Sequence, residues 1–157
     1  MSVNFRIKSL PSEEFLPLMQ MTDRELSLLD AKWIDVEEEP GYPCRVTLSD
    51  AKKGERVLFL PYWHHNVKSP YKAMGTILVR EGAESTHFEV NQIPSMLQSR
   101  LLSVRAYNTK NIMVNHSVTE GTQLSEEIQK QLGQTDASYL QLHFAGPGCF
   151  CCTVERA

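Results

Sequence analysis

Hydrophobic and polar residues alternate most regularly near the end of the chain. Residues 138–144 place a large apolar side chain at every second position, and residues 150–154 repeat the pattern. This period of two is typical of β-strands with one buried face. The Gly146-Pro147-Gly148 segment between them predicts a tight turn. The two segments are therefore predicted to form an antiparallel hairpin.

The register of this predicted hairpin follows from its apolar faces. A three-residue loop pairs Leu142 with Cys152 and keeps apolar residues opposite one another, whereas a slip of one residue mixes the two faces. A four-residue loop would set His143 against Phe150. In the favoured register His143 lies directly across from Cys151, with β-carbons about 4.5–5.5 Å apart.

Other segments also have the composition of strands. They are rich in β-branched and large apolar residues and are bounded by turn residues. These predicted strands cover residues 5–7, 32–36, 56–60, 76–80, 101–107 and 112–116. Residues 61–70, which carry aromatic side chains and two histidines, are predicted to form a loop, where sites commonly lie.

Helices are predicted to be short. Thr22 and Glu25 have the spacing of a capping box, in which each side chain bonds to the other residue's backbone amide. The clearest helix has an apolar stripe at spacings of four, with Thr122 as its cap and Gly133 at its end. Brief helices are also predicted after Ser12 and over residues 94–98.

Length and element order favour one α+β domain covering residues 1–157. The chain is 41% hydrophobic, which is enough for a conventional core without a disulfide or a structural metal. We expect a mainly antiparallel sheet, curled toward a barrel, with a few short helices packed on one side or end.

Charge and cysteine content limit the function classes. The net charge is −3, and Lys52-Lys53 is the only Lys/Arg doublet, so a nucleic-acid partner is not expected. The beginning of the chain has no apolar leader, and no stretch is long enough to span a bilayer. Three of four cysteines cluster at residues 149–152, unlike a disulfide framework. We therefore expect a cytoplasmic protein with free thiols and no membrane partner.

The last predicted hairpin offers two kinds of chemistry. A histidine beside a thiol can stabilise the reactive thiolate, so His143 is a candidate base for a thiol on the same face of the hairpin, where Cys151 and Cys149 lie. Alternatively, Cys149, Cys151 and His143 offer two sulfurs and one nitrogen to zinc. An ordinary cross-strand pair on a half-exposed sheet also accounts for the pattern.

Candidate ligand-binding residues lie elsewhere in the chain. His64 and His65 are neighbours in the predicted loop and would face opposite ways in an extended segment. Arg45, Arg80 and Arg105 are candidates for holding a carboxylate or a phosphate, since a guanidinium suits two-point recognition of these groups. No Gly-rich phosphate loop, nucleophile elbow or His-Glu-x-x-His helix is present.

Several short motifs together resemble one known family, the bacterial domain of unknown function 1203. The similarity runs over nearly the whole length. The residues that carry it are Pro40-Gly41-Tyr42-Pro43-Cys44-Arg45, Leu48, Asp50-Ala51, Gly54-Glu55, Tyr62, His64, Pro70-Tyr71, Ala73, Gly75, Val79-Arg80-Glu81, Arg105-Ala106-Tyr107, His143 and Pro147-Gly148-Cys149-Phe150. The resemblance implies a compact α+β domain without an assigned activity.

Three functions are consistent with the sequence. The first is an uncharacterised small-ligand-binding domain, whose ligand lies near His64, His65 and the polar face bearing His143 and Cys149. The second is a thiol-dependent enzyme with Cys149 or Cys44 as the nucleophile and a histidine as the base, and the third is a zinc-binding module. No cofactor is predicted, zinc being the one alternative, and a small molecule is the expected partner. Neither a reaction nor an oligomeric state follows from the sequence.

Overall fold

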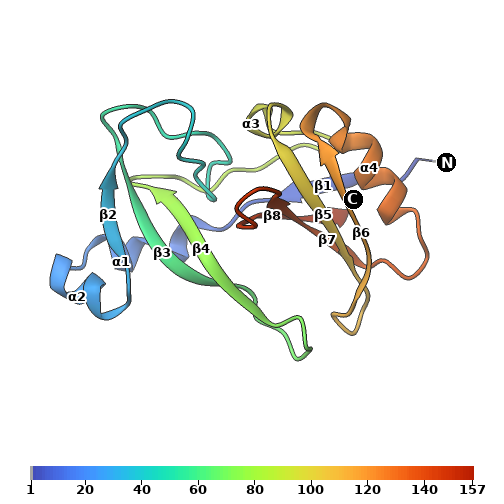
Figure 1. Cartoon of the computed structure of the whole chain (residues 1–157), viewed down its shortest axis with the longest axis horizontal. Coiled ribbons are helices and arrows are strands. Elements are labelled where there is room, and N and C mark those ends of the chain that lie inside the picture. The colour runs from blue at the N-terminus through green and yellow to red at the C-terminus, as the bar shows by residue number, and fades with distance from the viewer. Residues whose placement is uncertain (1) are drawn as a thin grey trace.

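Two antiparallel sheets lie side by side in the computed structural model, which describes residues 2–157 (Figure 1). The predicted α+β class with short helices is confirmed. Neither sheet closes into a barrel within the described chain. The irregular segment 81–94 carries the chain from β4 (Ala73–Arg80) in one sheet to β5 (Leu101–Tyr107) in the other. These two strands do not pair, so the predicted curl toward a barrel is interrupted between them.

The larger sheet has five strands and holds both ends of the described chain. Their spatial order is β1 (Phe5–Lys8), β8 (Phe150–Arg156), β7 (Tyr139–Phe144), β5 (Leu101–Tyr107) and β6 (Met113–Glu120). The predicted strand at residues 5–7 is therefore an edge strand, paired with the last strand of the chain. The predicted hairpin at residues 101–116 is also present, although its second strand continues to Glu120.

Helix α4 (Leu124–Leu132) covers one face of this sheet. Its apolar stripe is fully buried, as the spacing of four predicts. The predicted cap is wrong: Gln123 occupies the N-cap position, and Thr122 lies in a preceding 3-10 turn, Gly121–Gln123. That turn packs against α3 (Ser95–Gln98) so closely that a β-carbon on Gly121 would lie 1.7 Å from the Leu97 carbonyl oxygen.

The smaller sheet has three strands, β2 (Lys32–Asp35), β3 (Arg56–His65) and β4 (Ala73–Arg80). Helices α1 (Leu16–Met19) and α2 (Asp23–Leu28) flank it (Figure 1). Both hydrogen bonds of the predicted capping box are present at the start of α2.

Residues 61–65 belong to β3, so the predicted loop begins later than expected. Pro61 is tolerated there because β2 pairs with β3 only as far as Phe59. Beyond Phe59 the β3 strand has a partner on one side alone, which is where proline can enter a strand.

The β7–β8 hairpin contains a bulge that the alternating pattern did not predict. Leu142 pairs with Cys152 as expected, but His143 pairs with Phe150. The pairs from Leu142–Cys152 outward therefore follow the register of a three-residue loop, whereas the pair His143–Phe150 at the tip follows that of a four-residue loop. Cys151 is the extra, unpaired residue of the bulge. The predicted pairing of His143 with Cys151 is therefore wrong.

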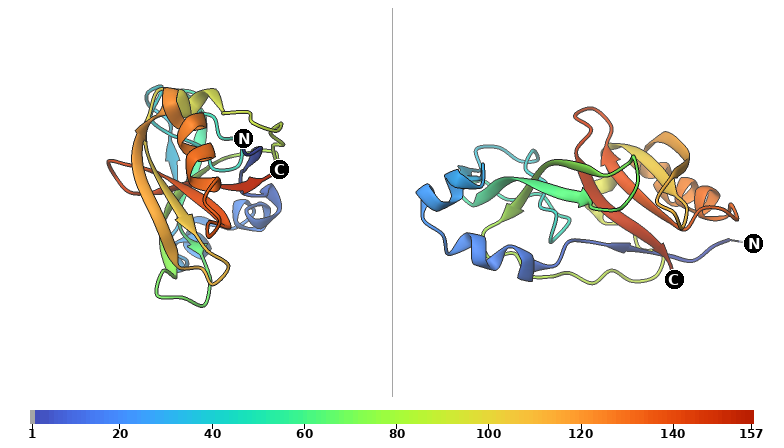
Figure 2. Two further views of the ribbon diagram at one scale, coloured as in Figure 1. Left: turned by 90° about the vertical axis from the view of Figure 1, so that its right-hand side faces the viewer. Right: turned by 90° about the horizontal axis from the view of Figure 1, so that it is seen from below.

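The same hairpin joins the two halves of the fold. Strand β8 contacts β4 of the smaller sheet, and Figure 2 shows the red hairpin beside the green strands. Phe150 packs into the core of the smaller sheet, whereas Cys151 and Cys152 pack into the core beneath α4. None of the helices in residues 2–157 has the length and apolar character needed to cross a membrane.

Candidate ligand-binding site

A cavity of about 520 Å³ opens between the two sheets at the tip of the β7–β8 hairpin. Its walls come from the loop 41–45, from β3 and β4, from the junction of α3 with β5, and from hairpin residues 144–149. This volume lies within the range of small-molecule sites. The cavity is therefore built by segments that are far apart in the sequence.

Most of the cavity wall is apolar. Large side chains come from both sheets and from the hairpin tip, namely Phe59, Leu78, Leu101 and Phe144. Sites for small organic molecules characteristically combine such walls with a few placed polar groups. The polar groups therefore define what kind of molecule the cavity suits.

Arg45 is the principal polar group of the cavity. It is only 3% exposed, and its guanidinium lies 5.0 Å from the centre of the Phe144 ring. Its Nε donates to the Phe150 carbonyl at 2.7 Å, and its Nη1 donates to the Pro43 carbonyl at 2.6 Å. No carboxylate within residues 2–157 forms an ion pair with it. Arg45 is thus a buried cation without a counter-charge.

Two backbone hydrogen bonds fix the position of Arg45. Its N–H donates to the Leu78 carbonyl of β4, and its carbonyl accepts from the N–H of Leu10. Burial lowers the pKa of the guanidinium. Arginine nevertheless stays protonated in proteins, so a full positive charge is held at this wall.

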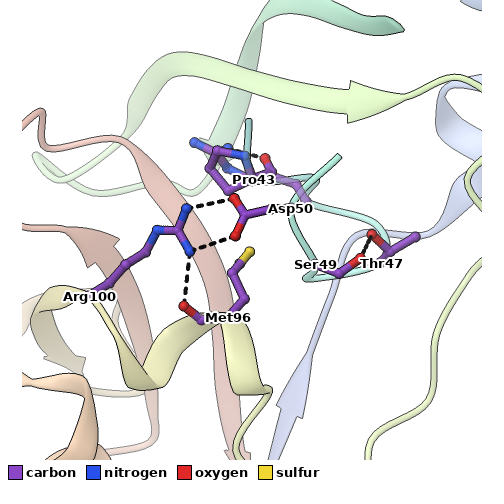
Figure 3. Close-up of polar contacts among 7 residues, drawn as sticks. Pro43, Thr47, Ser49, Asp50, Met96 and Arg100 are labelled. Carbon is purple, nitrogen blue, oxygen red and sulfur yellow. Dashed lines mark hydrogen bonds and ion pairs between the residues drawn. The ribbon is translucent and has the colours of Figure 1, made fainter. Parts of the chain in front are cut away.

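A second guanidinium, that of Arg100, lies on the same wall but is neutralised. Its Nη2 donates to Asp50 Oδ1 at 2.6 Å, and its Nη1 donates to Asp50 Oδ2 at 3.1 Å. Figure 3 shows this two-point ion pair together with the bond from Arg100 to the Met96 carbonyl. The Arg100 guanidinium also lies 5.4 Å from the centre of the Phe144 ring. The net charge of the two arginines and Asp50 is therefore +1.

Cys149 contributes a thiol to the cavity wall. It is partly exposed, whereas the other three cysteines are buried, and all four are free thiols as predicted. Its carbonyl accepts from the Phe144 N–H at 2.9 Å, which fixes the base of the hairpin tip. Cys44 is fully buried, and its sulfur accepts from the Arg80 N–H at 3.3 Å.

The bulge sets Cys151 and Cys152 side by side in the core beneath α4. A hydrogen bond from Cys152 lowers the pKa of the Cys151 thiol. Burial raises the pKa of Cys152. Both thiols have no exposed surface, so neither reaches the cavity directly.

The two predicted site histidines His64 and His143 meet on the other face of the hairpin. Their rings lie 5.1 Å apart, edge to face, and the His64 ring stacks on Phe150 at 5.2 Å. His64 Nδ1 lies 3.4 Å from Gln141 Oε1, and the Gln141 amide donates to the His64 carbonyl at 2.8 Å. His143 is 1% exposed, and its Nδ1 lies 2.9 Å from the Gly148 carbonyl. We call His64, Gln141, His143 and Phe150 the histidine cluster.

Burial determines the charge state of this cluster. It lowers the pKa of His143 to about 3, and Arg105 and His64 act in the same direction. Burial also lowers the pKa of His64. Since His143 is neutral at physiological pH, its Nδ1 carries the proton that it donates to Gly148.

His65 faces away from His64, as their adjacency predicts. Its Nδ1 lies 2.8 Å from the Tyr71 carbonyl, its Nε2 lies 2.6 Å from the Tyr139 hydroxyl, and its ring packs on Tyr107 at 4.3 Å.

The three predicted arginines do not converge on one site. Arg80 lies 3.7 Å from Glu55, and the Nε of Arg105 donates to Ser103 near the histidine cluster. Of the nine residues predicted to form a catalytic, ligand-binding or zinc site, only Arg45 and Cys149 line the cavity.

The residues predicted to hold zinc are not brought together. In residues 2–157 no group of three or more His, Cys, Asp and Glu side chains is placed to hold a metal ion. The bulge explains this result, because it turns Cys151 into the core beneath α4 while His143 faces the smaller sheet.

The fold and the cavity together define a class of protein, namely an α+β domain with a cationic cavity between two open antiparallel sheets. A family model described as a protein of unknown function, DUF1203, matches residues 41–156, and the chain belongs to this family. The predicted resemblance is thereby confirmed. No curated protein and no solved structure gives a significant match.

Sequence reasoning missed two residues of the cavity wall, Arg100 and Phe144, and also Asp50, which lies outside the wall and pairs with Arg100. Asp50 and Arg100 are 50 positions apart, and no local motif links them. Phe144 was predicted as a core residue from its place in the alternation, and the pattern carries no signal that its ring also borders a cavity.

Proposed function

We propose that the protein binds a small organic monocarboxylate with an apolar body, held in the cavity between the two sheets. The observation that carries this proposal is Arg45, a buried guanidinium that lines the cavity and has no carboxylate partner. A buried cation without a counter-charge is costly, and an anionic ligand would supply the missing charge.

The charges in the wall favour a single negative charge on the ligand. Asp50 neutralises Arg100, so one guanidinium is left to be matched. A dianion such as phosphate would retain an unmatched charge in a largely apolar space. The apolar side chains Phe59, Leu78 and Leu101 suit a hydrocarbon body beside the carboxylate.

A thiol-dependent enzyme with a histidine base has weaker support. Cys149 lines the cavity, but no histidine, aspartate or glutamate does so among the described residues. His143 is the histidine nearest to Cys149 in the sequence, and its Nδ1 donates to the Gly148 carbonyl. Cys44 is enclosed in the core of the smaller sheet.

Calorimetric titration with hexanoate and with its neutral isostere hexanamide tests the proposal. We expect hexanoate to bind at least about tenfold more tightly, because a charge-assisted hydrogen bond contributes roughly 1.5–3 kcal/mol. Arg45→Gln should abolish the difference. Arg80→Gln is the matched control, since Arg80 lies outside the cavity wall.

Two outcomes would contradict the proposal: equal affinity for hexanoate and hexanamide in the unaltered protein, or a preference that survives Arg45→Gln. Arg45→Lys covers the case in which the glutamine variant fails to fold, because it keeps the charge and loses the two-point geometry. It should retain a weakened preference for hexanoate.

A further inference from the structure

We propose that Cys149 forms a mixed disulfide, within the cavity, with small disulfide molecules that carry a carboxylate. The inference rests on the proposed function, because Arg45 is taken to hold the carboxylate of the incoming molecule. It adds covalent and reversible capture to simple binding. It also gives a role to Cys149, which binding of a carboxylate alone does not require.

The position of Cys149 is the first support. It lies on the same cavity wall as Arg45 and Arg100, and it is the one thiol with exposed surface in residues 2–157. Cys149 is also close enough to Arg45 to act electrostatically on its guanidinium, as the buried thiols of Cys151 and Cys44 do. A disulfide whose carboxylate rests on Arg45 would therefore be held beside a free thiol.

The absence of other reactive groups indicates which chemistry the thiol can perform. No side chain in the described cavity wall can act as a general base, since the wall contains no histidine, aspartate or glutamate. Hydrolysis or group transfer through a thioester would need such a base to activate the second nucleophile. Thiol–disulfide exchange needs a thiolate and an accessible disulfide.

The step itself is an exchange without net oxidation. The Cys149 thiolate attacks one sulfur of the small disulfide, a new S–S bond forms, and the original S–S bond breaks. The released half leaves as a thiolate and takes a proton from water. The half that stays bound keeps its carboxylate on Arg45, and a second small thiol reverses the reaction by attacking the new bond.

Paired disulfides test the inference. The probes are dithiodipropionate, which has a carboxylate on each half, and bis(2-hydroxyethyl) disulfide, which is neutral. Intact mass and peptide mapping follow the rate of addition at each cysteine, and the result is expressed as the rate with dithiodipropionate divided by the rate with the neutral probe. The same rate ratio measured on urea-unfolded protein corrects for the intrinsic reactivity of the two probes. In the folded protein we expect addition at Cys149 alone, with the charged probe favoured about tenfold over the unfolded ratio.

Competition by hexanoate tests the role of the cavity in the unaltered protein. Hexanoate should slow the reaction of dithiodipropionate at Cys149 and leave that of the neutral probe less affected, while Cys149→Ser should abolish addition. A folded protein whose Cys149 stays unmodified, or reacts with both probes in the unfolded ratio, overturns the inference. If hexanoate still binds in calorimetry, that result leaves the proposed function standing, so the two failures are distinguishable.

Discussion

The two faces of the β7–β8 hairpin lie against polar side chains in opposite circumstances. On one face, His64 and His143 are packed against Phe150 and Gln141, and both contact the Gln141 side chain. On the other face, Arg45 borders a cavity and has no counter-charge. The histidines already have their contacts within the protein, whereas Arg45 lacks a negative charge that a ligand could provide.

This difference shows that residue type alone is a poor guide to a site. The histidines are the more conspicuous residues in the sequence, yet burial keeps His143 neutral and holds it against the Gly148 carbonyl. Arg45 is an ordinary residue type in a loop. Its environment, an apolar cavity without a carboxylate, is what makes it a candidate for binding.

The largest predicted effect concerns the packed face. Phe150→Ala should lower the free energy of unfolding by about 3–5 kcal/mol, because the ring is 2% exposed and fills the core next to both histidines. Phe144→Ala should cost less, about 2–3 kcal/mol, because that ring is 7% exposed and already borders a cavity, so its removal adds little new empty space to the packed core. Urea unfolding measures both variants, and equal losses would contradict the contrast between the faces.

The second prediction is acid sensitivity of the histidine cluster. The unfolded chain protonates His143 near pH 6.5, but the folded chain does so only near pH 3, so acid favours the unfolded state. Between pH 7 and 4.5 this one group should cost about 2–3 kcal/mol. His64 shifts in the same direction, so the comparison must be with His143→Gln, whose stability should fall less steeply. Parallel curves for the two proteins would count against the buried neutral imidazole.

The third prediction concerns the charge on the cavity wall. Asp50→Asn frees Arg100 and should lower stability by about 1–2 kcal/mol, because a partly buried two-point ion pair is lost. The cavity then has two unmatched guanidinium groups. Calorimetry should show tighter binding of inorganic phosphate than in the unaltered protein. An unchanged preference between hexanoate and phosphate would argue against control of ligand charge by Asp50.

The smallest effect is expected at Arg80. Its ion pair with Glu55 spans 3.7 Å at the surface, and such pairs contribute little. Arg80→Gln should change stability by no more than about 0.5 kcal/mol and leave hexanoate affinity unaltered. A large loss of binding in this variant would place the anion site away from Arg45.

Much of the fold could be predicted because strands and capping boxes are local patterns. The alternation over residues 138–144 predicted strand β7 and the Thr22–Glu25 spacing predicted the start of α2, although β7 is buried on both faces and not on one as the alternation indicated. The bulge at Cys151 could not be predicted in this way, because each of the two candidate registers satisfies part of the hairpin. One extra residue was enough to separate His143 from Cys151.

The site was less predictable than the fold because its parts meet only through tertiary packing. Arg45 was named from its residue type, together with two arginines that the fold disperses. Its distinguishing feature, burial without a carboxylate, depends on where β4, the hairpin tip and Asp50 lie in space. Cys149 was named for a histidine partner, whereas its neighbours in the cavity wall are arginines and apolar side chains.

Chemical-shift mapping with hexanoate on isotope-labelled protein tests the central claim most directly, because it reads both faces of the hairpin at once. We predict that the backbone amides of Leu101, Gly146 and Cys149 shift as hexanoate is added, while hexanamide has little effect and the His64 and His143 ring signals stay in place. Shifts centred on the histidine rings, or equal responses to hexanoate and hexanamide, would contradict the account.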